Sequence, residues 1–354
     1  MTPTRVDLLQ GSKPILASKS RKQLRTLVLV SILLAIVVVT LGAYTRLTHA
    51  GLGCPDWPTC YGLVDVPQTA EQIAVAEKAY PDRPVEPQKA WNEMIHRYFA
   101  GALGLFILAI AIISFKSAIN KSEDRLPFAL PLIILCVVIF QAALGMWTVT
   151  LKLMPIVVMG HLLGGFTTLC LLFLLYLRLK NQSTIVGEFH LKKYGRYALI
   201  GIAILTGQIA LGGWTSSNYA ALSCVELPIC QQGWQERITF EESFDVIPPK
   251  RESYEFGHLS FDQRLTIHVV HRIGALVTIL YLGWLILMVF MQANTSLLKN
   301  SASMVGLLLV IQVCLGMSNI WFSLPIAVAV GHNIIAACLM MALLTLTYRL
   351  RRKI

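Results

Sequence analysis

Eight long apolar stretches constrain what this chain can fold into more than any other feature of its sequence. A transmembrane α-helix needs ~20 predominantly apolar residues. Only 14% of the 354 residues are charged, whereas an ordinary soluble domain carries ~25%. The sequence therefore predicts an all-α integral membrane protein, and it excludes an ordinary soluble enzyme and a disordered chain. The predicted spans are 27–45, 92–114, 127–148, 156–177, 197–217, 264–290, 301–322 and 325–347.

Basic residues are concentrated on one side of the predicted helices. Because the number of spans is even, both termini lie on that side, together with the loops at 115–126, 178–196 and 291–300. This side carries 19 Lys and Arg against four acidic residues, and the positive-inside rule makes it cytoplasmic. The net charge of +11 is thus explained by topology and contact with anionic lipid, and no nucleic-acid partner is predicted. We expect a multi-pass protein of a bacterial inner membrane whose two long loops face the periplasm.

The second half of the chain repeats the first at an offset of 170 or 171 residues. Leu41–Thr45 recurs as Leu211–Thr215, and Gln141–Met146 recurs as Gln312–Met317. Because each half has four spans, both halves have the same orientation, which implies a pseudo-two-fold axis along the membrane normal. The predicted segments are a cytoplasmic tail at 1–26, a four-helix bundle at 27–180, a cytoplasmic linker at 181–196, a second four-helix bundle at 197–348 and a cytoplasmic tail at 349–354.

Each of the two long outer loops, 46–91 and 218–263, carries a Cys-x5-Cys pair. An oxidising compartment such as the periplasm favours disulfides. The usual zinc spacing Cys-x2-4-Cys and the heme-attachment motif Cys-x-x-Cys-His do not occur in the sequence. We therefore predict the disulfides Cys54–Cys60 and Cys224–Cys230, in preference to pairing between the two loops, with metal binding as the alternative. The remaining cysteines lie in the spans, where small apolar side chains are expected: Cys136, Cys170, Cys314 and Cys338.

Four histidines inside the predicted spans correspond to one another across the repeat: His96 to His271, and His161 to His332. A titratable side chain in hydrocarbon is costly and marks a functional site, although an interhelical hydrogen bond is the alternative. Each half thus offers two imidazoles at similar depth on different helices. Axial histidines of this kind hold heme iron, whereas zinc or copper would need further ligands that the spans do not supply.

The motifs in these regions together resemble the heme A synthase family, over residues 27–348. They are Thr45-Arg46-Leu47-Thr48, Gly51-Leu52-Gly53-Cys54-Pro55-Asp56-Trp57-Pro58, Glu93-x-x-His96-Arg97, Gly160-His161, His271-Arg272 and Gly331-His332. The resemblance implies an eight-helix membrane enzyme that supplies cytochrome oxidase with heme A. Such an enzyme oxidises the C8 methyl of heme O to a formyl group by two successive hydroxylations with molecular oxygen.

The same resemblance implies roles for individual residues. His271 and His332 would be the axial ligands of a resident heme b iron, and His96 and His161 would hold the substrate heme. Glu93 would be catalytic. The implied partners are heme O synthase, the cytochrome oxidase assembly machinery and an unidentified electron donor, besides membrane lipid; homo-oligomerisation is left open.

The two halves differ in one respect that bears on function. Glu93 precedes His96 by three residues, whereas the corresponding position before His271 is His268. A carboxyl beside one site only could move protons or stabilise positive charge on the substrate, or it could simply pair with Arg97. His268 is also an alternative ligand to His271, although the repeat favours His271.

The arginines that follow the histidines have two interpretations. Arg97 and Arg272 are candidate contacts of heme propionates, or side chains that extend to the membrane surface.

A competing function is a two-heme membrane electron carrier with bis-histidine sites and no substrate chemistry. Glu93 argues against it, because a symmetric carrier needs no carboxyl in one half only. An ATP-driven heme exporter is disfavoured, because the sequence has no GxxxxGK[ST] phosphate loop.

Overall fold

The computed structural model describes residues 19–119, 126–180 and 188–351. Within these ranges the secondary structure is helical, with no named strand, and eight helices are long and apolar enough to cross a membrane. The predicted all-α membrane class is therefore confirmed. The spanning helices are α1 (Lys19–Leu47), α3 (Pro87–Ile119), α4 (Ala129–Thr150), α5 (Pro155–Leu179), α6 (Tyr194–Ser217), α7 (Phe261–Gln292), α8 (Ser296–Trp321) and α9 (Ile326–Arg351). Most of the predicted N-terminal tail and parts of the predicted linker and C-terminal tail lie outside the described residues.

Several helices are longer than the apolar stretches that predicted them. α1 begins at Lys19 and α3 at Pro87, where the predicted spans begin at 27 and 92. A proline is well suited to the first turn of a helix, because its missing N–H has no intrahelical partner there. α7 begins after Ser260, which forms a capping box with Gln263. Hydropathy identifies only the part of each helix that lies in lipid. The first residue of a helix depends on local features such as a proline in its first turn or a capping box.

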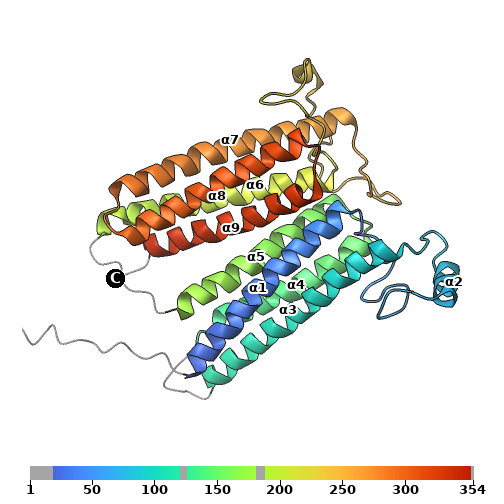
Figure 1. Ribbon diagram of the computed structural model, residues 1–354, viewed down its shortest axis with the longest axis horizontal. Coiled ribbons are helices and arrows are strands. Elements are labelled where there is room, and N and C mark those ends of the chain that lie inside the picture. The colour runs from blue at the N-terminus through green and yellow to red at the C-terminus, as the bar shows by residue number, and fades with distance from the viewer. Residues whose placement is uncertain (1–18, 120–125, 181–187, 352–354) are drawn as a thin grey trace, which may run out of the picture.

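The spanning helices form two groups, which Figure 1 shows as the lower and the upper half of the molecule. We call α1, α3, α4 and α5 the first bundle, and α6, α7, α8 and α9 the second bundle. In the first bundle, α1 and α4 each contact both α3 and α5, so that α3 and α5 lie on opposite sides of the bundle. In the second bundle, α6 and α8 contact both α7 and α9 in the same way.

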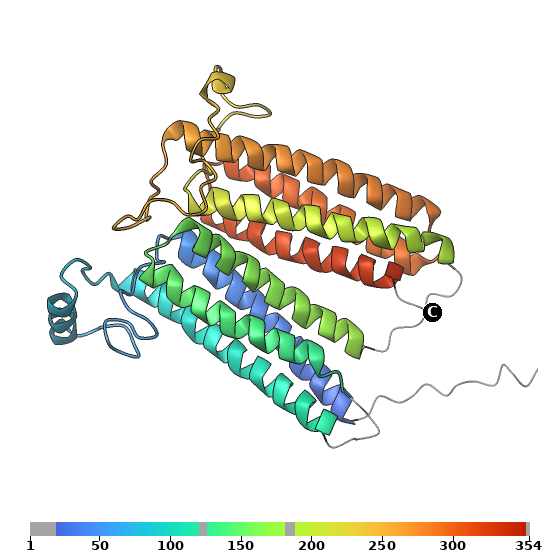
Figure 2. The ribbon, with the colours of Figure 1, turned by 180° about the vertical axis from the view of Figure 1, so that it is seen from behind.

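The two bundles meet through α1 and α5 of the first and α6 and α9 of the second, as the view from behind also shows (Figure 2). The contacts are α1 with α9, α5 with α6, and α5 with α9. In the sequence repeat α1 corresponds to α6, and α5 to α9. The contact of α1 with α9 is therefore the counterpart of that between α5 and α6, which is the pattern a two-fold relation requires.

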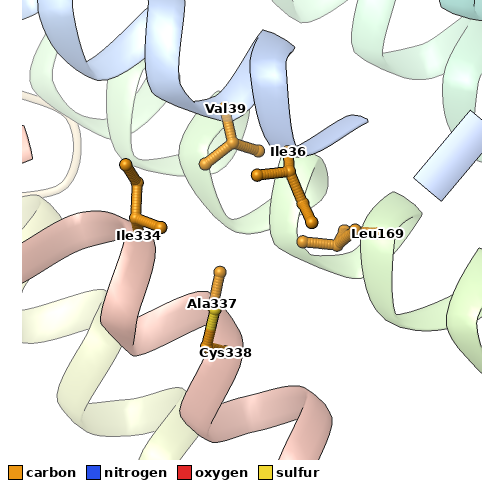
Figure 3. A pocket seen from close by; sticks show the side chains of 6 residues that line it. All are labelled: Ile36, Val39, Leu169, Ile334, Ala337 and Cys338. Atoms are coloured by element: carbon orange, nitrogen blue, oxygen red, sulfur yellow. The ribbon is translucent and has the colours of Figure 1, made fainter. Parts of the chain in front are cut away.

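Leucines of α5 and α9 contribute to the fully buried part of the core. Leu172 and Leu175 on α5 are 0% exposed, and so are their counterparts in the repeat, Leu343 and Leu346. Nearby, a small hollow between α1, α5 and α9 is lined only by apolar side chains and one thiol (Figure 3): Ile36, Val39, Leu169, Ile334, Ala337 and Cys338. With no acid, base or imidazole in its lining, this hollow is part of the packing and not a centre of polar chemistry.

The outer loops contain both disulfides, Cys54–Cys60 and Cys224–Cys230. The first loop also contains a short helix, α2 (Ala70–Ala79), and the second contains the 3-10 turn η3 (Trp234–Arg237). A second 3-10 turn, η2 (Phe189–Lys193), precedes α6.

Contacts between the outer ends of the bundles join the two halves. The Arg46 guanidinium lies over the Tyr219 ring, 4.0 Å from its centroid, and donates to the Ser216 carbonyl at 2.6 Å. Arg83 pairs with Glu255 at 3.2 Å between the two long loops. Because these contacts cross from one half to the other, the loops and the bundles form one connected outer surface.

Candidate functional site

The first-half histidines face one another across the first bundle. His96 comes from α3 and His161 from α5, and their ring centroids are 6.4 Å apart with the ring planes at 86°. Two imidazoles on opposite sides of one metal ion, each with a nitrogen ~2 Å from the metal, have ring centroids roughly 6 Å apart. The observed separation therefore fits a pair of axial ligands.

The hydrogen bonding of the rings agrees with this interpretation. Nδ1 of His96, His161 and His332 is buried and has no hydrogen-bond partner. Buried imidazole nitrogens without partners are rare, and a bound group in each bundle would account for them. Within the described ranges, no three His, Cys, Asp or Glu residues are grouped so as to hold a metal ion. The residues present thus fit heme iron between two histidines rather than a zinc or copper site.

Each of the four histidines packs against a glycine of the spanning helix that precedes its own. In all four cases the nearest side-chain atom to a Cβ built on the glycine would be Cε1 of the imidazole, at a distance that leaves little or no room for a side chain. The distances are 3.0 Å for Gly42 and His96, 3.4 Å for Gly145 and His161, 3.2 Å for Gly212 and His271, and 3.2 Å for Gly316 and His332. The glycines therefore let the rings lie inside the bundles.

These glycines are not those that the sequence places next to the histidines along the chain. Nothing lies within 4 Å of a Cβ built on Gly101 or Gly104. All four glycines that do contact histidines were already aligned by the repeat, Gly42 with Gly212 and Gly145 with Gly316. The repeat thus contained these glycines. Which glycine contacts which histidine, however, depends on how each helix is rotated about its axis.

Two glutamines also contact the second-half histidines, and the sequence analysis did not identify them. Gln208 Nε2 lies 3.1 Å from His271 Nδ1 and donates to the His271 carbonyl at 3.1 Å. Gln312 Nε2 lies 3.2 Å from His332 Nε2. Both glutamines precede the contacting glycine by four residues, a Gln-x-x-x-Gly spacing that could have been found in the sequence.

The Glu93 carboxylate is buried, with 5% of the residue exposed, and it binds the first disulfide loop. Oε2 accepts a hydrogen bond from the Cys54 N–H at 3.0 Å, and the Gly53 N–H also bonds to the carboxylate. Oε1 pairs with Arg97. Gly53 has to be a glycine because a Cβ there would lie 2.6 Å from the backbone carbonyl of Lys89. The loop backbone can therefore approach α3 closely enough to donate to Glu93.

Arg97 and Arg272 hold the two disulfide loops onto the bundles. Arg97 donates to the carbonyls of Thr59 at 2.7 Å and Asp56 at 3.0 Å. Arg272 donates to the carbonyls of Cys224 and, at 2.8 Å, Glu226. The guanidinium groups thus have backbone partners in this structure, and their predicted contact with heme propionates stays a prediction.

His268 occupies the position of Glu93 in the second bundle. It is 4% exposed and lies one helical turn before His271 on α7, and its Nδ1 has no hydrogen-bond partner. Arg272 therefore binds the second disulfide loop without a carboxylate at the position that Glu93 occupies in the first bundle. This difference between the halves is the one that the sequence predicted.

The sequence that forms this site can be compared with known proteins. Residues 25–344 match the COX15-CtaA family, described as cytochrome oxidase assembly proteins. The chain is 46% identical to the heme A synthase of Shewanella oneidensis over 331 residues, which cover 94% of this chain and 98% of that protein. It is also 24% identical to the heme A synthase of Bacillus licheniformis over 349 residues, covering 94% and 99% of the two chains.

These matches extend over the spanning helices, both disulfide loops and all four site histidines. The chain therefore belongs to the COX15-CtaA family of cytochrome oxidase assembly proteins.

Proposed function

We propose that this protein is a heme A synthase, which oxidises the C8 methyl of heme O to a formyl group by two successive hydroxylations. One structural observation carries the proposal: two imidazoles from opposite sides of a membrane bundle face one another at 6.4 Å. This spacing suits a planar heme held by its iron. The similarity to heme A synthases along nearly the whole chain supports the same function.

The two bundles have different tasks in this proposal. His96 and His161 hold the substrate heme O in the first bundle. His271 and His332 hold a resident heme b in the second, where Gln208 and Gln312 reach their rings. When bound, heme b supplies a route for electrons between an external donor and the substrate site. The histidines orient the two macrocycles, and the glycines beside them leave room for the rings.

Glu93 is the proposed catalytic residue because it is the carboxylate that lies one helical turn before His96 on α3. Its carboxylate lies one helical turn before His96, and Arg97 balances its charge. From there Oε1 or Oε2 can accept a proton released by the substrate. The alternative is that Glu93 serves only to anchor the loop, as its bonds to Cys54 and Gly53 show that it also does.

The proposed location follows from charge and disulfides. We place the termini in the cytoplasm and the disulfide loops in the periplasm of a bacterial inner membrane, because the loops on the side of the termini carry the basic excess. The two disulfides suit an oxidising compartment. In this setting heme O synthase supplies the substrate, and cytochrome oxidase assembly consumes the product.

A two-heme electron carrier is the second candidate, because four histidines in two bundles also suit electron transfer. The discriminating experiment is acid extraction of heme from membranes that contain this protein together with a heme O synthase. We expect formyl heme with the wild-type chain, and heme O alone with His96→Ala or His161→Ala. Membranes that contain the folded, heme-loaded wild type and yet yield only heme O would support the carrier.

A further inference from the structure

Two polar groups without partners lie at the outer end of the second bundle, and the first of them is Arg264 on α7. Arg264 precedes the fully buried Leu282 by eighteen residues, about five helical turns, so both lie on one line of the helix. His271 lies close to the same line, about two turns inward from Arg264. The Arg264 side chain therefore leaves α7 on the side that faces the inside of the bundle, and its Nε is buried.

Nε of Arg264 donates to no acceptor in the part of the chain that the structure describes. A guanidinium can only donate hydrogen bonds, and a buried donor without an acceptor is rare. The nearest carboxylate along the chain, that of Asp262, pairs with Arg237 at 2.8 Å. Arg264 is also the fourth residue of α7, at the end of the helix where the macrodipole favours negative charge. Both observations indicate that the missing partner of Arg264 is an anion.

The second group is the amide of Asn319 on α8, whose Oδ1 is buried and has no partner among the described residues. Asn319 follows Gln312 by seven residues and Gly316 by three. Gln312 and Gly316 both contact the His332 ring. Asn319 therefore lies on the same face of α8, about two turns closer to the outer surface than Gln312. Because α7 packs against α8, Arg264 and Asn319 lie on neighbouring helices at a similar depth.

The equivalent positions of the first bundle both have partners. The counterpart of the arginine is Lys89, at the offset of 175 residues that relates the histidines of α3 and α7. Its Nζ pairs with the exposed carboxylate of Glu86 at 2.8 Å. The counterpart of the asparagine is Thr148, whose Oγ1 donates to the Gly145 carbonyl at 2.7 Å. The groups that lack a partner thus belong to the second bundle, the one to which the proposed function assigns the resident heme.

We propose that Arg264, together with the Asn319 amide, binds a propionate carboxylate of the heme b in the second bundle. The inference rests on the proposed function and names the groups that recognise the outer edge of that heme. A guanidinium binds a carboxylate through two parallel hydrogen bonds. The two turns between Arg264 and His271 span about 10 Å, which suits the reach from the centre of a porphyrin to its carboxylates. Heme b has two propionates, so this contact is additional to the one predicted for Arg272.

The test measures the heme b of the full-length protein, purified from cells without a heme O synthase. Arg264→Gln removes the counterion of the propionate, and the uncompensated carboxylate then favours ferric over ferrous iron. A unit charge about 10 Å away, at an effective dielectric constant of ~20, shifts such an equilibrium roughly tenfold, or about 59 mV for one electron. We expect the midpoint potential to fall by about that amount, and the propionate bending mode in the resonance Raman spectrum to shift. Asn319→Leu should shift the same mode with a smaller change in potential.

Lys89→Gln is the matched control, because it removes a cation from the equivalent position of the first bundle and should change neither readout. Arg264→Lys keeps the charge but loses the planar fork, so its potential should stay near the wild-type value while the propionate mode shifts. Arg264→Gln with heme b at the wild-type potential and an unshifted mode would overturn the inference. If Arg264→Gln holds no heme b, an unshifted mode in Arg264→Lys overturns it. Failure of the proposed function has a different signature: a heme b that responds to these substitutions in a protein that makes no heme A.

Discussion

Glu93→Gln is the substitution whose consequences the structure specifies best. The glutamine has the same size, and its oxygen can still accept from the Cys54 N–H. Its NH2 group, however, would face the Arg97 guanidinium, so that a buried ion pair is replaced by two donors. The two side chains are only 6% and 12% exposed. Breaking a buried pair by changing one partner costs about 3–5 kcal/mol.

This cost falls on the first disulfide loop, because Glu93 and Arg97 both bind its backbone. A loss of ~3 kcal/mol corresponds to roughly a 100-fold change in an equilibrium constant. We therefore expect Glu93→Gln to speed reduction of the Cys54–Cys60 disulfide by a small thiol about 100-fold. Cys54 and Cys60 are both 0% exposed, so the thiol reaches them only when the loop opens.

The assay carries its own control, because the same molecule contains the Cys224–Cys230 disulfide, which Arg272 holds without a carboxylate. Its reduction rate should not change in Glu93→Gln. If Cys54–Cys60 is reduced at the wild-type rate in Glu93→Gln, the reasoning about the ion pair is refuted.

The same variants separate anchoring from catalysis. Arg97→Gln loosens the loop by a similar amount but keeps the carboxyl. If Glu93 acts on the substrate, Glu93→Gln should keep normal heme b and bound heme O yet make ~10²–10⁴-fold less heme A, whereas Arg97→Gln should retain more activity. Heme A formed at the normal rate by Glu93→Gln would reduce Glu93 to an anchor of the loop.

Three further predictions concern other parts of the molecule. His271→Ala should lose heme b while His268→Ala largely keeps it, as measured by heme content after purification; the reverse result would reassign the ligand. Gly53→Ala should loosen the first loop and lower Tm, since its Cβ would meet the α3 backbone at 2.6 Å, whereas Gly101→Ala, with open space around it, should change Tm little. Burial raises the pKa of the Glu188 carboxyl, but hydrogen bonds at the N-terminus of α8 outweigh it and hold that pKa below 4.5. Glu188→Gln should therefore lower Tm at neutral pH, and its difference from wild type should shrink as the pH falls below 4.5; a difference that grows in acid would contradict this assignment.

The spans of the fold could be predicted from the sequence because lipid leaves little choice of structure. Apolar stretches that cross a bilayer have to form helices, because a helix pairs its backbone N–H and C=O groups within one segment. The other structure that pairs them all in lipid is a closed β-barrel. The helix ends were harder, because they depend on capping residues such as Ser260. The short helix α2 was missed, although Thr69 and Gln72 form a capping box that could have marked its start.

The residues of the candidate site could be predicted where the two halves of the chain can be aligned. The four histidines stood out because they form two pairs across the repeat, His96 with His271 and His161 with His332, and the Glu93–His268 difference stood out for the same reason. The contacts of Gln208 did not, because they join helices 63 residues apart in the chain and depend on how those helices are rotated. The pairing of Arg97 with Glu93 was anticipated, but its other partners were hidden, since they are backbone carbonyls of a loop whose conformation no spacing encodes.

The most direct test of the proposed activity is conversion by the purified protein itself. The full chain, loaded with heme b and supplied with heme O, a reductant and molecular oxygen, should produce heme carrying a formyl group at C8, identified by mass spectrometry of the extract. His161→Ala under the same conditions should leave heme O unchanged. A folded protein that binds both hemes and passes electrons between them, but never forms the formyl product, would contradict the proposal that this chain is an enzyme.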